Sequence, residues 1–174
     1  TLMKMSDITV AAGGKSIVNA AYSSGKPSFG VGPGNTQCVV DRDVKIHDYI
    51  DMVVKGRTYD NGILCTCEQS LIVPTEQLND VINALVDRDG YYVQGQDIDR
   101  FREALFPNNS INPKVIGRPV YEIGKITGID VPKDKKFIFV ISEKYGKEEL
   151  FSKEKLCSVL NIIAYDKFDE AINI

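Results

Sequence analysis

The segment of this chain best suited to chemistry is residues 59–70, which read YDNGILCTCEQS and place Cys65 between a helical pattern and an apolar run. Asp60, Asn61 and Gly62 favour a turn. A thiol in such a connection can be presented to a ligand by the rigid elements on either side. Cys65 is therefore a candidate nucleophile. The alternative, at this point, is a small buried apolar residue, which is the commoner role of a free cysteine.

Cys67 forms a C-x-C pair with Cys65, and such pairs also occur in metal sites and redox disulfides. No second cysteine pair follows, and the only histidine, His47, lies upstream without ligand spacing. Four-ligand zinc geometry therefore has too few partners in this sequence. We expect no metal site, and we expect Cys67 to pack as a small residue near the start of a strand.

Residues 30–35 read GVGPGN and could be mistaken for a phosphate-binding loop. The spacing is not G-x-G-x-x-G at the start of a helix, because the apolar strand pattern of residues 37–40 follows it. From the residues alone, the segment is the approach to a strand, with two backbones close together.

The elements that must position these residues alternate between strand and helix patterns. We expect strands at 8–12, 37–40, 71–73, 137–141 and 158–164. We expect helices after Gly14, over 44–53, after an N-cap at Thr75, over 98–105, over 118–127 and near 168–172. This alternation predicts an α/β fold with a largely parallel sheet and helices on both faces.

The composition indicates a globular protein with a core of its own. The chain has 174 residues, of which 43% are hydrophobic and 26% charged. The net charge of -3 argues against a nucleic-acid partner. No apolar run reaches the length of a membrane span, so no membrane partner is expected. The four cysteines form no dense disulfide framework, so we expect reduced thiols in a cytoplasmic protein.

Three segments, in order, resemble the CoA-acylating aldehyde dehydrogenases. They are the glycine-rich residues 23–36 with Asn35, the segment around Cys65, and residues 154–160, which read EKLCSVL. The resemblance covers nearly the whole chain. It is strongest to the CoA-dependent succinate-semialdehyde dehydrogenases, followed by the aldehyde half of bifunctional aldehyde-alcohol dehydrogenases. It implies the fold of the aldehyde dehydrogenase catalytic domain.

The resemblance also implies roles for individual residues. Cys65 would be the nucleophile that forms a thioester, with NAD or NADP as cofactor and coenzyme A as co-substrate. Its own backbone N–H would help to stabilise the oxyanion. Glu154 matches a glutamate that binds the nicotinamide ribose, although the run 153–155 could equally be solvated surface. Gly13 and Gly14 match a turn close to the cofactor, while Ser158 stands where the family usually has proline.

Val31 takes the place of the glutamate that activates water in hydrolytic aldehyde dehydrogenases. The resemblance therefore implies that this segment holds no base for water. The acyl-enzyme would instead be resolved by the thiol of coenzyme A, and the product would be an acyl-CoA.

We expect residues 1–174 to be a single domain, the cysteine-containing catalytic domain, without the cofactor-binding domain that family members carry. Both ends of the chain look cut within helical patterns, so we expect a segment of a longer, homo-oligomeric enzyme that is inactive alone. Two rivals stay open. One is a catalytically silent assembly or regulatory domain, which a deeply buried Cys65 would favour. The other is an unrelated thiol hydrolase, which needs a histidine near Cys65.

Overall fold

The computed structural model describes residues 2–174, which fold as two compact units divided between Gly34 and Asn35. No helix among these residues is long and apolar enough to cross a membrane. The assignment of residues 1–174 to a single catalytic domain stays a prediction.

The first unit is a β-α-β arrangement. It contains α1 (Leu2–Met5), β1 (Thr9–Ala12), α2 (Lys15–Tyr22) and β2 (Ser28–Val31), and its two strands are parallel. Gly30 lies against α2, since a Cβ atom at this position would be 2.6 Å from Cγ1 of Val18. The backbone of Gly30 thus lies close to side chains of α2 rather than to a second backbone. Gly30 lies within strand β2, which the sequence did not predict.

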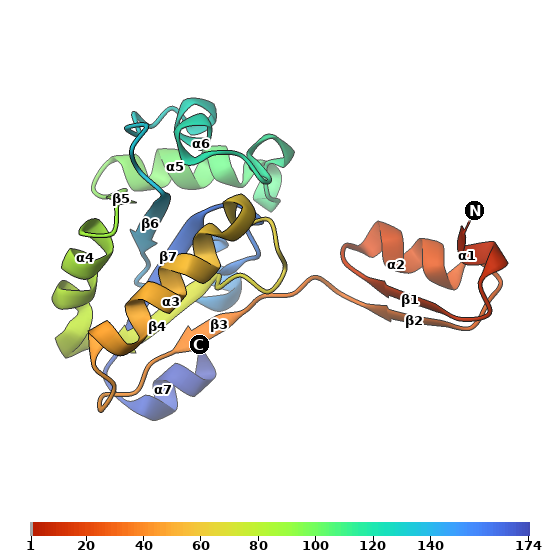
Figure 1. The fold of residues 1–174 in the computed structure, drawn as a ribbon, viewed down its shortest axis with the longest axis horizontal. Helices are drawn as coiled ribbons and strands as arrows, with labels where there is room; N and C mark the ends of the chain where they lie inside the picture. The colour runs from red at the N-terminus through yellow and green to blue at the C-terminus, as the bar shows by residue number, and fades with distance from the viewer. Residues whose placement is uncertain (1) are drawn as a thin grey trace. The chain divides into compact units, whose positions relative to one another are not determined.

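The second unit is built on a five-stranded sheet in which every pairing is parallel (Figure 1). The strand order is β3-β4-β7-β6-β5. The strands are β3 (Gln37–Val39), β4 (Ser70–Pro74), β5 (Gly90–Tyr92), β6 (Phe137–Ile141) and β7 (Val159–Tyr165). The helices are α3 (Ile46–Thr58), α4 (Leu78–Val86), α5 (Asp97–Leu105), α6 (Val120–Thr127) and α7 (Phe168–Asn173). The predicted α/β class is confirmed.

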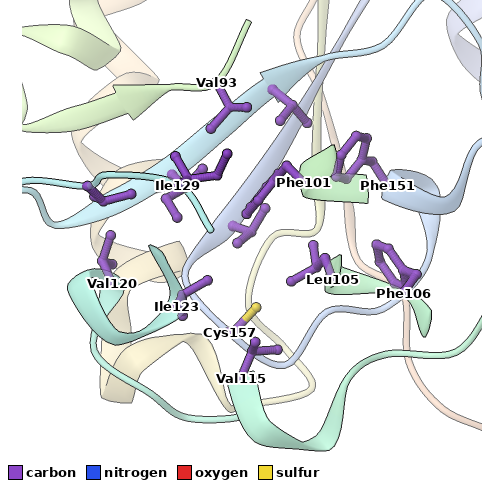
Figure 2. Close-up of a cluster of buried hydrophobic side chains, with 14 residues drawn as sticks. Val93, Phe101, Leu105, Phe106, Val115, Val120, Ile123, Ile129, Phe151 and Cys157 are labelled. Carbon is purple, nitrogen blue, oxygen red and sulfur yellow. The ribbon is translucent and has the colours of Figure 1, made fainter. Parts of the chain in front are cut away.

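The two faces of this sheet are covered by different helices because side chains alternate along each strand. Phe137 and Phe139 pack with buried residues of α3 and α4, whereas Ile138 and Val140 pack with those of α5 and α6. Figure 2 shows the second of these clusters, in which Cys157 lies beside Val115. Helix α7 covers β4 and β7 through a smaller cluster that includes Ile72 and Ala171.

Two local expectations differ from the structure. Thr75 is not the N-cap of α4, because a 3₁₀ turn over Thr75–Gln77 comes first and the Thr75 hydroxyl donates to Oδ1 of Asp166 at 2.7 Å. Strand β5 was not expected, since its three residues Gly90–Tyr92 are too few to show a pattern.

Candidate active site

The three segments that carry the resemblance in the second unit meet at one edge of its sheet. Asn35 and Thr36 precede β3, residues 59–69 (the cysteine loop) precede β4, and residues 153–158 (the glutamate loop) precede β7. Strands β3, β4 and β7 are adjacent and parallel, so they begin at the same edge. We call these three segments together the amino edge.

Gln69 connects all three segments of the amino edge. Its backbone N–H donates to the carbonyl of Thr36 at 2.8 Å, and its side-chain oxygen accepts the backbone N–H of Lys155 at 3.0 Å. The side chain of Asn35 also donates to the carbonyl of Ser152, the residue just before the glutamate loop, at 2.8 Å. The segments are thus held together by directional hydrogen bonds.

The cysteine loop begins with three consecutive residues in the left-handed region. Asp60, Asn61 and Gly62 have φ angles of 47°, 53° and 70°. Asp, Asn and Gly tolerate this conformation far better than other residue types, which explains why the sequence places them here. A turn then follows, closed by the N–H of Cys67 donating to the carbonyl of Leu64 at 3.1 Å. Cys65 lies at the corner of that turn.

The four thiols differ sharply in environment. Cys65 is exposed, Cys38 is half-buried, and Cys67 and Cys157 are buried. Burial raises the pKa of Cys38 and Cys67, and it raises that of Cys157 to about 11. The prediction that Cys67 is a small packing residue just before β4 is confirmed. Cys65 is therefore the one exposed thiol of the four, and its role as the nucleophile stays a prediction.

The backbone of Cys65 is fixed on one side only. Its carbonyl accepts a hydrogen bond from the Thr36 hydroxyl at 3.4 Å. Within residues 2–174, the N–H of Cys65 donates to no protein acceptor. A free N–H beside the thiol is the kind of donor that an oxyanion requires.

Arg57, in the last turn of α3, is a site residue that the sequence analysis missed. Its side chain is completely buried, and its guanidinium donates to the carbonyls of Glu68 at 2.7 Å, Gly62 at 3.0 Å and Cys157. A signal was available, because Arg57 follows Val53 by four positions and therefore falls on the buried stripe of α3.

Glu154 lies half-buried in the glutamate loop. Burial raises the pKa of its carboxyl group, and the nearby Arg57 acts in the opposite direction. Residues 153–155 are not a fully solvated charged run, because Lys155 is completely buried. Its Nζ donates to the carbonyls of Phe151 at 2.6 Å and Lys153 at 3.1 Å. Burial lowers the pKa of Lys155 to about 7.

Gly13, Gly14 and Val31 belong to the first unit. Gly13 has a φ of 142°, and its N–H donates to the carbonyl of Val31 at 3.1 Å. A Cβ atom at Gly14 would meet nothing within 4 Å, so a ligand could approach its backbone. The side chain of Val31 is exposed. Their relation to Cys65 stays a prediction.

A cavity of about 320 Å³ opens beside the cysteine loop on the side of α3. Its wall includes Tyr59, Leu64 and Thr66, which flank Cys65 in the sequence, and the helix residues Met52 and Lys55. Cys67 also lines this cavity, whereas Cys65 does not, so the cavity is not placed at the exposed thiol.

Two curated relatives match almost the whole chain. The acetylating succinate-semialdehyde dehydrogenase of Clostridium kluyveri is 41% identical over 174 residues, which is 99% of this chain and 38% of that protein. An aldehyde-alcohol dehydrogenase of Clostridium acetobutylicum is 41% identical over 171 residues, 98% of this chain and 20% of that protein. Over nearly its whole length the chain is similar to acylating aldehyde dehydrogenases. It spans about two fifths of the first relative's length and a fifth of the second's.

Solved structures of this family agree with the fold. An acetylating aldehyde dehydrogenase from Geobacillus thermoglucosidasius superposes with a TM-score of 0.91 at 32% identity, over 99% of this chain and 38% of that one. A propionaldehyde dehydrogenase from Rhodopseudomonas palustris, with bound propionyl-CoA, gives 0.83 at 25% identity, over 96% and 37%. An engineered glycolyl-CoA reductase with bound NADP+ gives 0.84 at 26%, over 99% and 40%. No family model matches the chain.

Proposed function

We propose that this chain supplies the nucleophile of an NAD(P)-dependent, CoA-acylating aldehyde dehydrogenase. The observation that carries the proposal is the position of Cys65. Its thiol is exposed at the corner of a turn, at the edge where the three matched segments meet, while two of the other three thiols are buried and the third is half-buried. A catalytically silent domain would be favoured by a deeply buried Cys65, which is not what is found.

The proposed reaction begins with attack of the Cys65 thiolate on the carbonyl carbon of an aldehyde. A carbon–sulfur bond forms, and the carbonyl oxygen becomes an oxyanion beside the N–H of Cys65. The chemistry that NAD(P) supplies when bound is acceptance of the hydride from the former carbonyl carbon. A thioester is then left on Cys65. The thiol of coenzyme A would attack this thioester and lose its proton to solvent. The carbon–sulfur bond to Cys65 then breaks, which releases an acyl-CoA and the Cys65 thiolate.

Glu154 suits a contact with the cofactor. Its carboxylate is half-buried yet makes no ion pair with a side chain among residues 2–174, so its oxygens can accept ribose hydroxyls. Gly13 and Gly14 are proposed as a second contact, on the open backbone at Gly14. The bound NADP+ and propionyl-CoA of the related structures support these two ligands for the parent enzyme.

The proposed product is an acyl-CoA rather than a free acid. Val31 offers no base to activate water, and an aliphatic side chain cannot replace a carboxylate in that role. Without coenzyme A, the thioester on Cys65 should therefore persist.

The test uses the longer protein that contains this segment, incubated with aldehyde and NAD(P) with and without coenzyme A. We expect acyl-CoA in the first case and, in the second, little acid and an acylated Cys65 in the mass spectrum. Cys65→Ser should lose both products, while Cys67→Ser serves as the matched control in the same loop. Acid formation at an undiminished rate without coenzyme A would contradict the proposal.

The chain by itself is proposed to lack dehydrogenase activity. Only Glu154 and the Gly13–Gly14 turn would contact the dinucleotide, and few contacts do not offset the entropy lost on binding. Calorimetric titration of the 174-residue chain with NAD should show no tight binding. A micromolar affinity of the chain for NAD would contradict this proposal, because it would require more cofactor contacts in these residues than Glu154 and the Gly13–Gly14 turn.

We further propose that the parent enzyme is cytoplasmic and homo-oligomeric and binds no nucleic acid. A catalytic thiolate favours a reducing compartment. The net charge of -3 gives no basic footprint for a nucleic acid.

A further inference from the structure

Arg57 is a buried cation whose bonding serves two loops at once. Its side chain has no exposed surface, and within residues 2–174 every hydrogen bond that it donates goes to a backbone carbonyl. Burying a charge is costly unless it is well bonded. The three carbonyls satisfy Nη1 and Nη2, whereas Nε is buried without a hydrogen-bond partner among the described residues, so Arg57 costs more than an apolar residue at the end of α3 would.

The acceptors of Arg57 lie in the cysteine loop and the glutamate loop. Nη1 donates to the carbonyl of Glu68, after Cys65, whereas Nη2 donates both to the carbonyl of Gly62, before Cys65, and to that of Cys157. One guanidinium thus holds the cysteine loop on both sides of the thiol. The same group ties this loop to the segment that carries Glu154.

Both loops contain left-handed backbone next to these acceptors. Asp60, Asn61 and Gly62 lie in this region, and so does Leu156, with a φ of 49°. Leucine has no side chain to favour this conformation, so it persists only where its surroundings impose it. The surroundings of Leu156 include the apolar cluster that buries the neighbouring Cys157 (Figure 2). They also include Arg57, which bonds the carbonyl of Cys157.

Gly62 makes the contact between the two loops direct. A Cβ atom at this position would be 2.6 Å from Nη2 of Arg57 and 2.6 Å from the carbonyl carbon of Cys157. No other residue type could bring the two backbones together around the guanidinium in this way.

We infer that Arg57 is a positioning residue, whose guanidinium fixes the cysteine loop against the glutamate loop and so sets where Cys65 stands relative to Glu154. The inference rests on the proposed function for the roles of those two residues. The distance between Cys65 and Glu154 matters for the reaction, because an aldehyde bound to Cys65 would have to lie against a nicotinamide whose ribose Glu154 would hold.

The test follows single amide protons by hydrogen exchange in the 174-residue chain. The N–H of Ile63 reports on the cysteine loop through its bond to the Asp60 carbonyl, and that of Gly117 reports on the glutamate loop through its bond to the Leu156 carbonyl. The N–H of Gln69 reports on the peptide that accepts Nη1. In Arg57→Met we expect exchange at all three to rise about tenfold or more.

Arg57→Lys gives a sharper result. Nη2 alone bonds Gly62 and Cys157, so a single ammonium can reach both carbonyls but not also that of Glu68. We expect near wild-type exchange at Ile63 and Gly117, with fast exchange at Gln69 only. Arg88→Met is the matched control, because Arg88 also bonds a backbone carbonyl of its own helix region and lies outside both loops.

Unchanged exchange at Ile63 and Gly117 in a folded Arg57→Met variant would overturn the inference. So would a uniform rise across the whole unit in Arg57→Lys, which would indicate general destabilisation. If Arg57→Met does not fold, Arg57→Lys decides alone. No aldehyde or cofactor enters these measurements, so an inactive Cys65 would refute the proposed function and leave this result intact.

Discussion

The apolar core between α3, α4 and the sheet and the amino edge of the same sheet are stabilised in opposite ways. The core side chains Leu71, Phe139 and Leu160 are fully buried and apolar. At the amino edge, Lys155 is fully buried, as is Arg57 in the adjoining turn of α3, and backbone near both residues is left-handed. The core gains free energy from burial, whereas the edge gives up some free energy to fix the position of groups around Cys65.

The largest effect should come from breaking the core. Phe139→Ala removes a buried ring that stacks on Tyr92 with centroids 4.9 Å apart. We expect the free energy of unfolding to fall by about 3–5 kcal/mol, because transfer and cavity terms add. Urea unfolding measures the loss. The alkylation rate of Cys65 in the folded variant should stay at the wild-type value, and a changed rate would show that core and edge are not separable.

A smaller but more local effect is expected from Gly62→Ala. The new methyl group would sit in a left-handed backbone, 2.6 Å from Nη2 of Arg57, and should cost about 1–3 kcal/mol. Gly128→Ala is the matched control, since Gly128 has a similar φ of 74° with nothing within 4 Å. Equal losses in the two variants would mean that the contact between Gly62 and Arg57 contributes nothing.

Lys155 allows the edge to be probed by pH. Unfolded, its pKa is near the ordinary value of 10.5, whereas burial lowers the folded value to about 7. Between these values the unfolded chain binds more protons, so raising the pH stabilises the folded state, by about 1.4 kcal/mol per pH unit. The free energy of unfolding therefore decreases as the pH falls toward 7. Below pH 7 the contribution of Lys155 no longer changes with pH.

The measurement compares the wild type with Lys155→Met by urea unfolding between pH 7 and 8.5. This window avoids Cys157, whose raised pKa of about 11 acts in the opposite direction at higher pH. The wild type should gain stability relative to the variant across the window. A difference that does not change with pH would show that Lys155 stays charged in the folded chain.

The sequence predicted the core better than the amino edge for physical reasons. Strand β6 is a continuous apolar run, and β7 is one interrupted only by Asn161, so the burial of most of their residues follows from residue type. Strand β5 and the turn before α4 depend on neighbours that local patterns do not reveal. Thr75, for instance, bonds to Asp166 rather than to its own helix.

The site was predicted in its parts but not in its assembly. Cys65 and Glu154 came from their segments, yet their common edge follows from the pairing of β4 with β7, strands far apart in the sequence. Arg57 and Lys155 were missed because charged residues are ordinarily exposed. Arg57 bonds the carbonyl of Cys157, far along the chain, whereas Lys155 bonds that of Phe151, four residues before it. The spacing of apolar residues can place Arg57 on a buried helix face, but it indicates neither of these bonds.

The most direct test of the central claim is the order in which the four thiols react. The native 174-residue chain would be treated with limiting iodoacetamide and its modified cysteines identified by peptide mapping. Cys65 should be labelled first, and Cys67, which shares its loop but is buried, is the internal control. Faster labelling of Cys38, Cys67 or Cys157 than of Cys65 would contradict the account.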